Sequence, residues 1–190
     1  MSHIQEEIQS IKAGLPEGVR LVAVSKFHPI GALQDAYDGG QRIFGESKVQ
    51  EMTQKYEALP KNIEWHFIGH LQTNKIKYMA SYVALIHGVD SYKLLAEINK
   101  QAAKARRIIP CLLQIHIAQE ETKFGFSTEE CRAMLEEGQW RQLDHVQIAG
   151  VMGMATNTED ETQIRREFST LSAFFQEIKE AYFKEVSSFK

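Results

Sequence analysis

The feature that most constrains this chain is a regular alternation of short apolar runs with segments of helical length. Six apolar runs, each short enough for one strand, are each followed by a segment with helical spacing. Strands that are apolar on both faces and separated by helices form parallel sheets. The predicted strands cover 20–27, 42–47, 64–69, 84–90, 109–118 and 146–155, and the predicted helices after them cover 29–38, 48–59, 74–82, a segment starting at Ser91, 129–138 and 159–182.

Two architectures accommodate these units: an open doubly wound sheet and a (β/α) barrel. No linker or shift in composition divides the 190 residues, so we predict one α/β domain over 1–190. The common barrel has eight strands, and in that interpretation two strands are absent from the sequence. Thr128 is predicted to cap the helix over 129–138.

Charge and cysteine content exclude some classes of function. A formal net charge of -3 leaves no basic excess for nucleic acid or an anionic membrane surface. Cys111 lies inside an apolar run, and its spacing from Cys131 is not that of a metal site. The first residues lack the apolar core of a signal peptide, and no apolar run reaches membrane-spanning length. We therefore expect a reduced, cytoplasmic protein.

Lys26 stands at the carboxyl end of the first predicted strand, where parallel α/β folds carry their sites. It shares a strand face with Val22 and Val24, so it caps a column of valines. Burial there lowers the pKa of the amine, and a free amine forms a Schiff base with a carbonyl. A structural salt bridge with Glu46 is the competing interpretation, and position alone does not decide between them.

His66 and His70 are four residues apart, the spacing of a helical metal site, but His66 lies in a predicted strand and the HExxH glutamate is absent. We therefore expect His66 to be a hydrogen-bonded core histidine and His70 to lie in the following loop. Met152 at the end of the sixth strand, considered without context, is expected in the core. No Walker, GxSxG or GxGxxG motif is present.

Five strings across the chain resemble the pyridoxal-phosphate homeostasis proteins, which are single-domain relatives of the alanine racemase N-terminal domain. They are "LVAVSKFHP", "FGESKVQE", "EWHFIGHLQTNK", "QIHIAQEETKFGF" and "GVMGMA". The resemblance implies a (β/α)8 TIM-type barrel that carries pyridoxal 5'-phosphate (PLP) on Lys26. It also implies that Ser47, where the family has asparagine, and Ile68 and Met152 lie beside the cofactor ring.

The resemblance also implies two further strands, which hold the phosphate in family members and which nothing in this sequence matches. This agrees with the count of six units out of eight. We expect full-length members to be monomers. For a chain with six strands we expect exposed edges, with self-association or weak PLP binding as the result.

The resemblance implies a non-catalytic PLP carrier in the cytoplasm, with PLP-dependent apo-enzymes as recipients of the cofactor. A PLP-dependent racemase or decarboxylase is the alternative, and it needs a second acid/base that no strand-end tyrosine or cysteine supplies here. A metal-dependent hydrolase that uses His66 and His70 is the third alternative.

Overall fold

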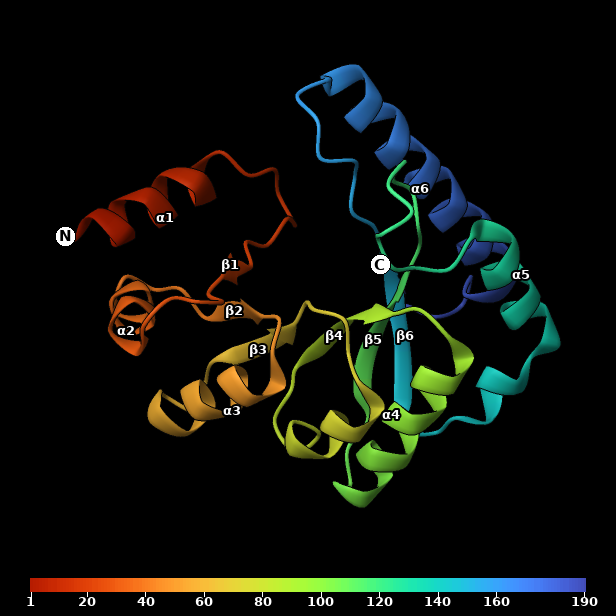
Figure 1. Ribbon diagram of the computed structural model, residues 1–190, viewed down its shortest axis with the longest axis horizontal. Coiled ribbons are helices and arrows are strands. Elements are labelled where there is room, and N and C mark those ends of the chain that lie inside the picture. The colour runs from red at the N-terminus through yellow and green to blue at the C-terminus, as the bar shows by residue number, and fades with distance from the viewer.

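A computed structural model describes all residues, 1–190, as a curved parallel sheet with helices on its convex side (Figure 1). The strands lie in sequence order, each hydrogen-bonded to the next, as in a (β/α) barrel. The six predicted strands are confirmed. Their bounds are β1 Ala23–Val24, β2 Ile43–Glu46, β3 Glu64–Phe67, β4 Leu85–Val89, β5 Ile109–Gln114 and β6 Val146–Met152.

A helix precedes β1, and helical segments follow every strand. They are α1 His3–Ala13, α2 Ile30–Asp38, α3 Val49–Ala58, the 3-10 helix η1 Thr73–Tyr78, α4 Tyr92–Lys104, α5 Thr128–Glu137, the 3-10 helix η2 Gln139–Gln142 and α6 Glu161–Tyr182. α4 begins directly after Ser91, close to the predicted start, and the Ser91 hydroxyl caps it by accepting from Leu94 N–H. No helix combines the length and apolar character needed to cross a bilayer.

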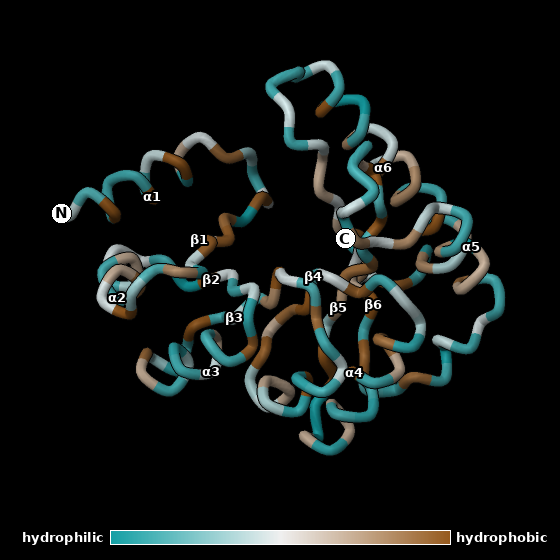
Figure 2. Tube along the Cα trace, in the orientation of Figure 1, coloured by the Kyte–Doolittle hydropathy of each residue, from teal (hydrophilic) through white to brown (hydrophobic).

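The main core lies between the sheet and the helices. Alternate strand residues point into it, including Phe44 on β2 and Trp65 on β3, whose rings lie 5.9 Å apart. Both are almost fully buried. Figure 2 shows the corresponding pattern along the chain, with largely apolar strands and helices that mix polar and apolar residues.

Several predicted details of the elements are wrong. β5 and β6 end at Gln114 and Met152 rather than at 118 and 155. β1 covers two residues rather than eight, because it pairs only with β2 and has no second neighbour to extend its ladder. The cap of α5 is Ser127 and not Thr128, since the Ser127 hydroxyl accepts from Glu130 N–H at 3.0 Å. The third predicted helix is a 3-10 helix.

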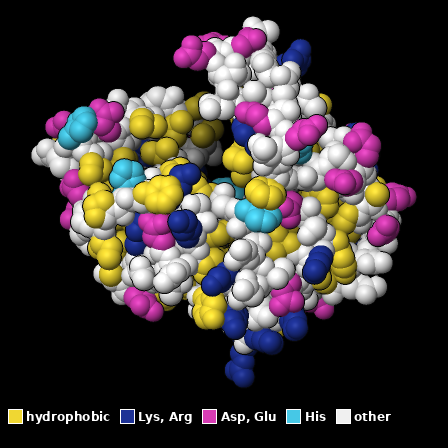
Figure 3. All heavy atoms as spheres, viewed as in Figure 1, with side chains coloured by type: hydrophobic (Ala, Val, Ile, Leu, Met, Phe, Trp, Pro, Cys, Tyr) yellow, Lys and Arg dark blue, Asp and Glu magenta, His cyan; other side chains and the backbone are white.

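The sheet is not closed, because β1 and β6 pair with β2 and β5 and not with each other. The last residue, Lys190, donates its N–H to Ala149 O on β6 at 2.9 Å. The space-filling view shows a hollow between the N-terminal and C-terminal halves, with apolar side chains along its N-terminal wall (Figure 3). This hollow is on the concave side of the sheet.

Candidate functional site

Lys26 lies in a tight turn directly after β1. Ser25 N–H donates to Gly45 O as the last ladder bond, and His28 N–H donates to Ser25 O at 3.1 Å, which closes the turn around Lys26 and Phe27. Phe27 has a φ of 66°, in the left-handed region that a bulky residue rarely adopts. Such a conformation costs about 1–3 kcal/mol and persists only where neighbouring groups hold it.

The Lys26 side chain is exposed, so its predicted burial is wrong. The valine face beneath it is open because β1 is an edge strand, and Val24 itself is 52% exposed. The argument from burial to a reactive amine therefore fails. What remains is a primary amine presented to solvent at the carboxyl end of β1.

The neighbours of β1 confirm which of its side chains share a face. A Cβ built on Gly45 would lie 3.1 Å from Val22 Cγ1 and 3.0 Å from Ile68 Cδ1, so these two side chains meet over the glycine on the concave face. Ser25 faces the opposite side, where its hydroxyl donates to Glu46 at 2.7 Å. The absent side chain at Gly45 leaves a shallow apolar surface below the Lys26 turn.

Glu46 is fully buried on the convex side and does not pair with Lys26. The alternative prediction of a structural salt bridge between them is therefore wrong. Glu46 Oε1 lies 2.6 Å from Lys55 Nζ, and Lys55 is 4% exposed. Lys55 Nζ also donates to Glu51 Oε1 at 2.7 Å and to Ser25 O at 2.8 Å. The hydrogen bond from Lys55, aided by one from Phe27 N–H, holds the pKa of Glu51 below its usual range.

The other predicted cofactor contacts are spread along the carboxyl edge of the sheet. Ser47 is half-buried just after β2, where a Cβ on Gly69 would come 2.8 Å from its Cα. Ile68 is half-buried after β3, and Met152 is half-buried at the end of β6. The structure thus brings Ile68 to the β1–β2 end through Gly45, while Met152 lies on the strand at the opposite edge.

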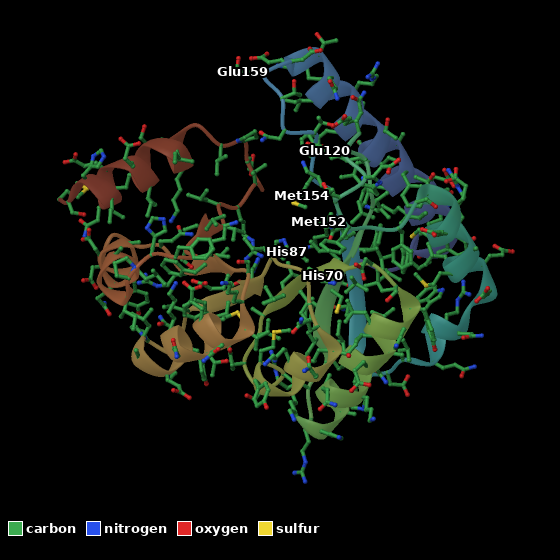
Figure 4. All side chains as sticks on the ribbon, viewed as in Figure 1. His70, His87, Glu120, Met152, Met154 and Glu159 are labelled. Carbon is green, nitrogen blue, oxygen red and sulfur yellow. The ribbon has the colours of Figure 1, made fainter.

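Figure 4 shows Met152, Met154, His70 and His87 gathered around the middle of the molecule, with Met154 projecting toward the N-terminal half. Ser47 and His70 also line a polar cleft of about 510 Å³ on the outer rim, together with Lys48, Lys75 and residues of α3.

His66 is a buried, hydrogen-bonded histidine, as predicted, and its partner is His87 on β4. The His66 Nδ1 and His87 Nε2 atoms are 2.9 Å apart. Burial lowers the pKa of His66 to about 3 and that of His87 to about 4, so both rings are neutral at pH 7. One ring therefore donates and the other accepts.

His70 is exposed in the following loop, as predicted. Its ring stacks on Phe124 with centroids 3.8 Å apart, and its Nδ1 lies 3.5 Å from Asp90. The two histidines thus engage different partners, and no group of three potential metal ligands includes them. The structure gives no support to the metal-dependent hydrolase.

Sequence reasoning missed the residues that hold the turn. Glu51 and Lys55 form an i,i+4 pair on α3, a signal visible in the sequence. Their contacts with Phe27 and Ser25 join residues 24 and 30 positions apart, which no local pattern reveals. His87 was missed for the same reason.

The whole chain matches a family profile described as "Alanine racemase, N-terminal domain", over residues 1–189. A protein from Aquifex aeolicus named "Pyridoxal phosphate homeostasis protein" is 35% identical over 186 residues, which cover 96% of this chain and 81% of that protein. A protein of the same name from Helicobacter pylori is 38% identical over 165 residues, covering 86% of this chain and 74% of that protein.

Solved structures agree with these relationships. PipY from Synechococcus elongatus without PLP superposes with a TM-score of 0.89 and 34% identity, covering 94% of this chain and 83% of that one. PipY with PLP bound has a TM-score of 0.85 and 33% identity over the same shares. An alanine racemase from Clostridium difficile, 14% identical with a TM-score of 0.76, shares the fold.

Proposed function

Because this chain belongs to the alanine racemase N-terminal domain family, we propose that it is a non-catalytic PLP-binding protein of PLP homeostasis, with the cofactor held as a Schiff base on Lys26. One observation carries the proposal: a held turn presents the Lys26 amine to solvent at the carboxyl end of β1. The names of the homeostasis relatives and the PLP-bound PipY support it.

The residues around the turn fit such a cofactor. PLP supplies an aldehyde, which joins a primary amine with release of one water. Lys26 supplies the amine, and Val22 and Ile68 supply an apolar surface over Gly45, where any larger side chain would fill the space. Ser47 offers a hydroxyl after β2 and Met152 an apolar side chain after β6, and both belong to the proposed contact set.

The absence of catalysis is part of the proposal, and the chemistry of both cysteines and of Tyr82 supports it. A racemase needs a second proton donor and acceptor opposite its lysine. Burial raises the pKa of the Cys111 thiol, and it raises that of Cys131 to about 12. Burial likewise raises the pKa of Tyr82 to about 12, and its hydroxyl is engaged with Thr53.

The proposal extends to the setting of the protein. It acts in the cytoplasm, where the buried free thiols of Cys111 and Cys131 stay reduced, and PLP-dependent apo-enzymes receive its cofactor.

The experiment is an absorbance titration of the protein with PLP. The wild type is expected to develop the band of a lysine-bound cofactor, and Lys26→Ala to lose it. Lys48→Ala is the matched control, because Lys48 is also exposed and its Nζ lies 5.4 Å from the Phe27 ring centre, against 5.9 Å for Lys26. Lys48→Ala should keep the band.

Two results would contradict the proposal. If the absorbance band persists in Lys26→Ala, Lys26 is not the residue that binds PLP. Exchange of the α-hydrogen of amino acids in deuterated water, at enzyme-like rates and dependent on Lys26, removes the non-catalytic assignment and favours a racemase or decarboxylase.

A further inference from the structure

The turn that carries Lys26 is hydrogen-bonded by side chains of β2 and α3, on the side of the sheet opposite the concave face. Phe27 N–H donates to Glu51 Oε1 at 2.8 Å, and Ser25 O accepts from Lys55 Nζ at 2.8 Å. The residues immediately before and after Lys26 are therefore each bound to a charged group. Lys26 itself is left without such a bond and points its amine to solvent.

The three charged side chains form one connected network. Lys55 Nζ uses its three donors on Ser25 O, Glu46 Oε1 and Glu51 Oε1, at 2.8, 2.6 and 2.7 Å. Glu46 also accepts from the Ser25 hydroxyl at 2.7 Å. Every donor of the buried ammonium is satisfied, which gives the network a single geometry.

Stability alone does not account for this network. A buried ion pair is weak evidence for stability, because its desolvation cost offsets much of its attraction. Glu46 Oε2 is in addition buried without a hydrogen-bond partner, which a purely stabilising cluster would avoid. The network does account for the left-handed φ of Phe27, a strained conformation that needs external support.

We propose that Glu46, Glu51 and Lys55 are positioning residues, which hold the Ser25–His28 turn in the conformation that directs the Lys26 amine toward a bound aldehyde. The inference rests on the proposed function of Lys26 and adds the residues that act through it. The hydrogen bonds of these three side chains to the turn run to Ser25 and Phe27, and none runs to Lys26.

The test uses Glu51, which is 23% exposed in its side chain and so tolerates substitution better than Lys55 or Glu46. Glu51→Ala removes the acceptor of Phe27 N–H. Glu51→Gln keeps an oxygen in reach of that N–H and removes only the charge. Glu57→Ala, an exposed glutamate on the same helix, is the matched control.

The first measurement is hydrogen exchange of the Phe27 amide in the cofactor-free protein. We expect exchange to be about tenfold or more faster in Glu51→Ala, close to wild type in Glu51→Gln, and unchanged in Glu57→Ala. The second is the rate at which PLP joins Lys26, followed by absorbance. It should fall by about tenfold or more in Glu51→Ala and recover in Glu51→Gln, because misplaced reacting atoms slow a reaction steeply.

Ile98→Val is the control that distinguishes a positioning effect from a general loss of stability. It shortens a fully buried side chain on α4, remote from the turn in sequence. If Ile98→Val, at a similar loss in Tm, slows PLP uptake as much as Glu51→Ala, the positioning role is overturned. Wild-type uptake in Glu51→Ala overturns it as well. A wild-type protein that forms no band on Lys26 instead removes the proposed function, and this inference with it.

Discussion

At the scale of single residues, the environment of each side chain depends on which neighbours the sheet provides. Lys26 occupies the strand-end position that its sequence indicates, yet it is exposed, because β1 has a neighbour on one side only. His66 and His87 show the opposite case. His66, which is buried, and His87, which is half-buried, are 21 residues apart in the sequence and become a hydrogen-bonded pair.

The histidine pair predicts a pH dependence of stability. The folded-state pKa values, about 3 for His66 and about 4 for His87, lie below the unfolded value near 6.5. Between about pH 4 and 6.5 the unfolded chain binds more protons, so the free energy of unfolding falls as pH falls. The slope is at most about 1.4 kcal/mol per pH unit for each histidine.

Urea unfolding at pH 7, 6 and 5 measures this slope. His87→Gln should reduce it, whereas His3→Gln, at an exposed position on α1, should leave it as in the wild type. Equal slopes in the wild type and His87→Gln would show that the pair does not titrate on unfolding in this range.

At the scale of elements, periodicity located the six strands and a helical segment after each of them, and it missed the 3-10 helix η2. Local hydrogen bonds decided where each element ends. The start of α5 is an example. Ser127 and Thr128 are both good capping residues, and the sequence analysis predicted Thr128. The structure selects Ser127, whose hydroxyl and N–H both bond to Glu130 in a capping box.

Substitution at the two positions tests this assignment. Ser127→Ala should lower the free energy of unfolding by about 1 kcal/mol, because it leaves Glu130 N–H without its acceptor. Thr128→Ala should change it far less, and chemical denaturation measures both. A larger loss in Thr128→Ala would restore the original prediction that Thr128 is the cap.

At the scale of the whole molecule, the sheet ends in two unpaired edges. β1 pairs only with β2 and β6 only with β5, and exposed edges are templates for pairing between chains. An apolar groove of about 310 Å³ beside β1, lined by side chains of α1 and α2, adds exposed apolar surface.

We therefore expect a polypeptide of residues 1–190 to associate as its concentration rises. Sedimentation velocity over about a hundredfold range of concentration measures this. Val24→Lys places a charge on the exposed residue of β1 and should shift the equilibrium toward monomer. A wild-type polypeptide that stays monomeric throughout would show that the edges are protected.

The sequence by itself determined the α/β class, the six strands and their succession along the chain, the face of β1 on which each side chain lies, and the identity of the residues at the strand ends. These follow from periodicity and from local turn chemistry, which act over a few residues. The tertiary structure decided the exposure of Lys26, the pairing of Glu46 with Lys55 and the contact between His66 and His87. Burial and long-range hydrogen bonds depend on which elements become neighbours in space, and no local pattern in the chain encodes that.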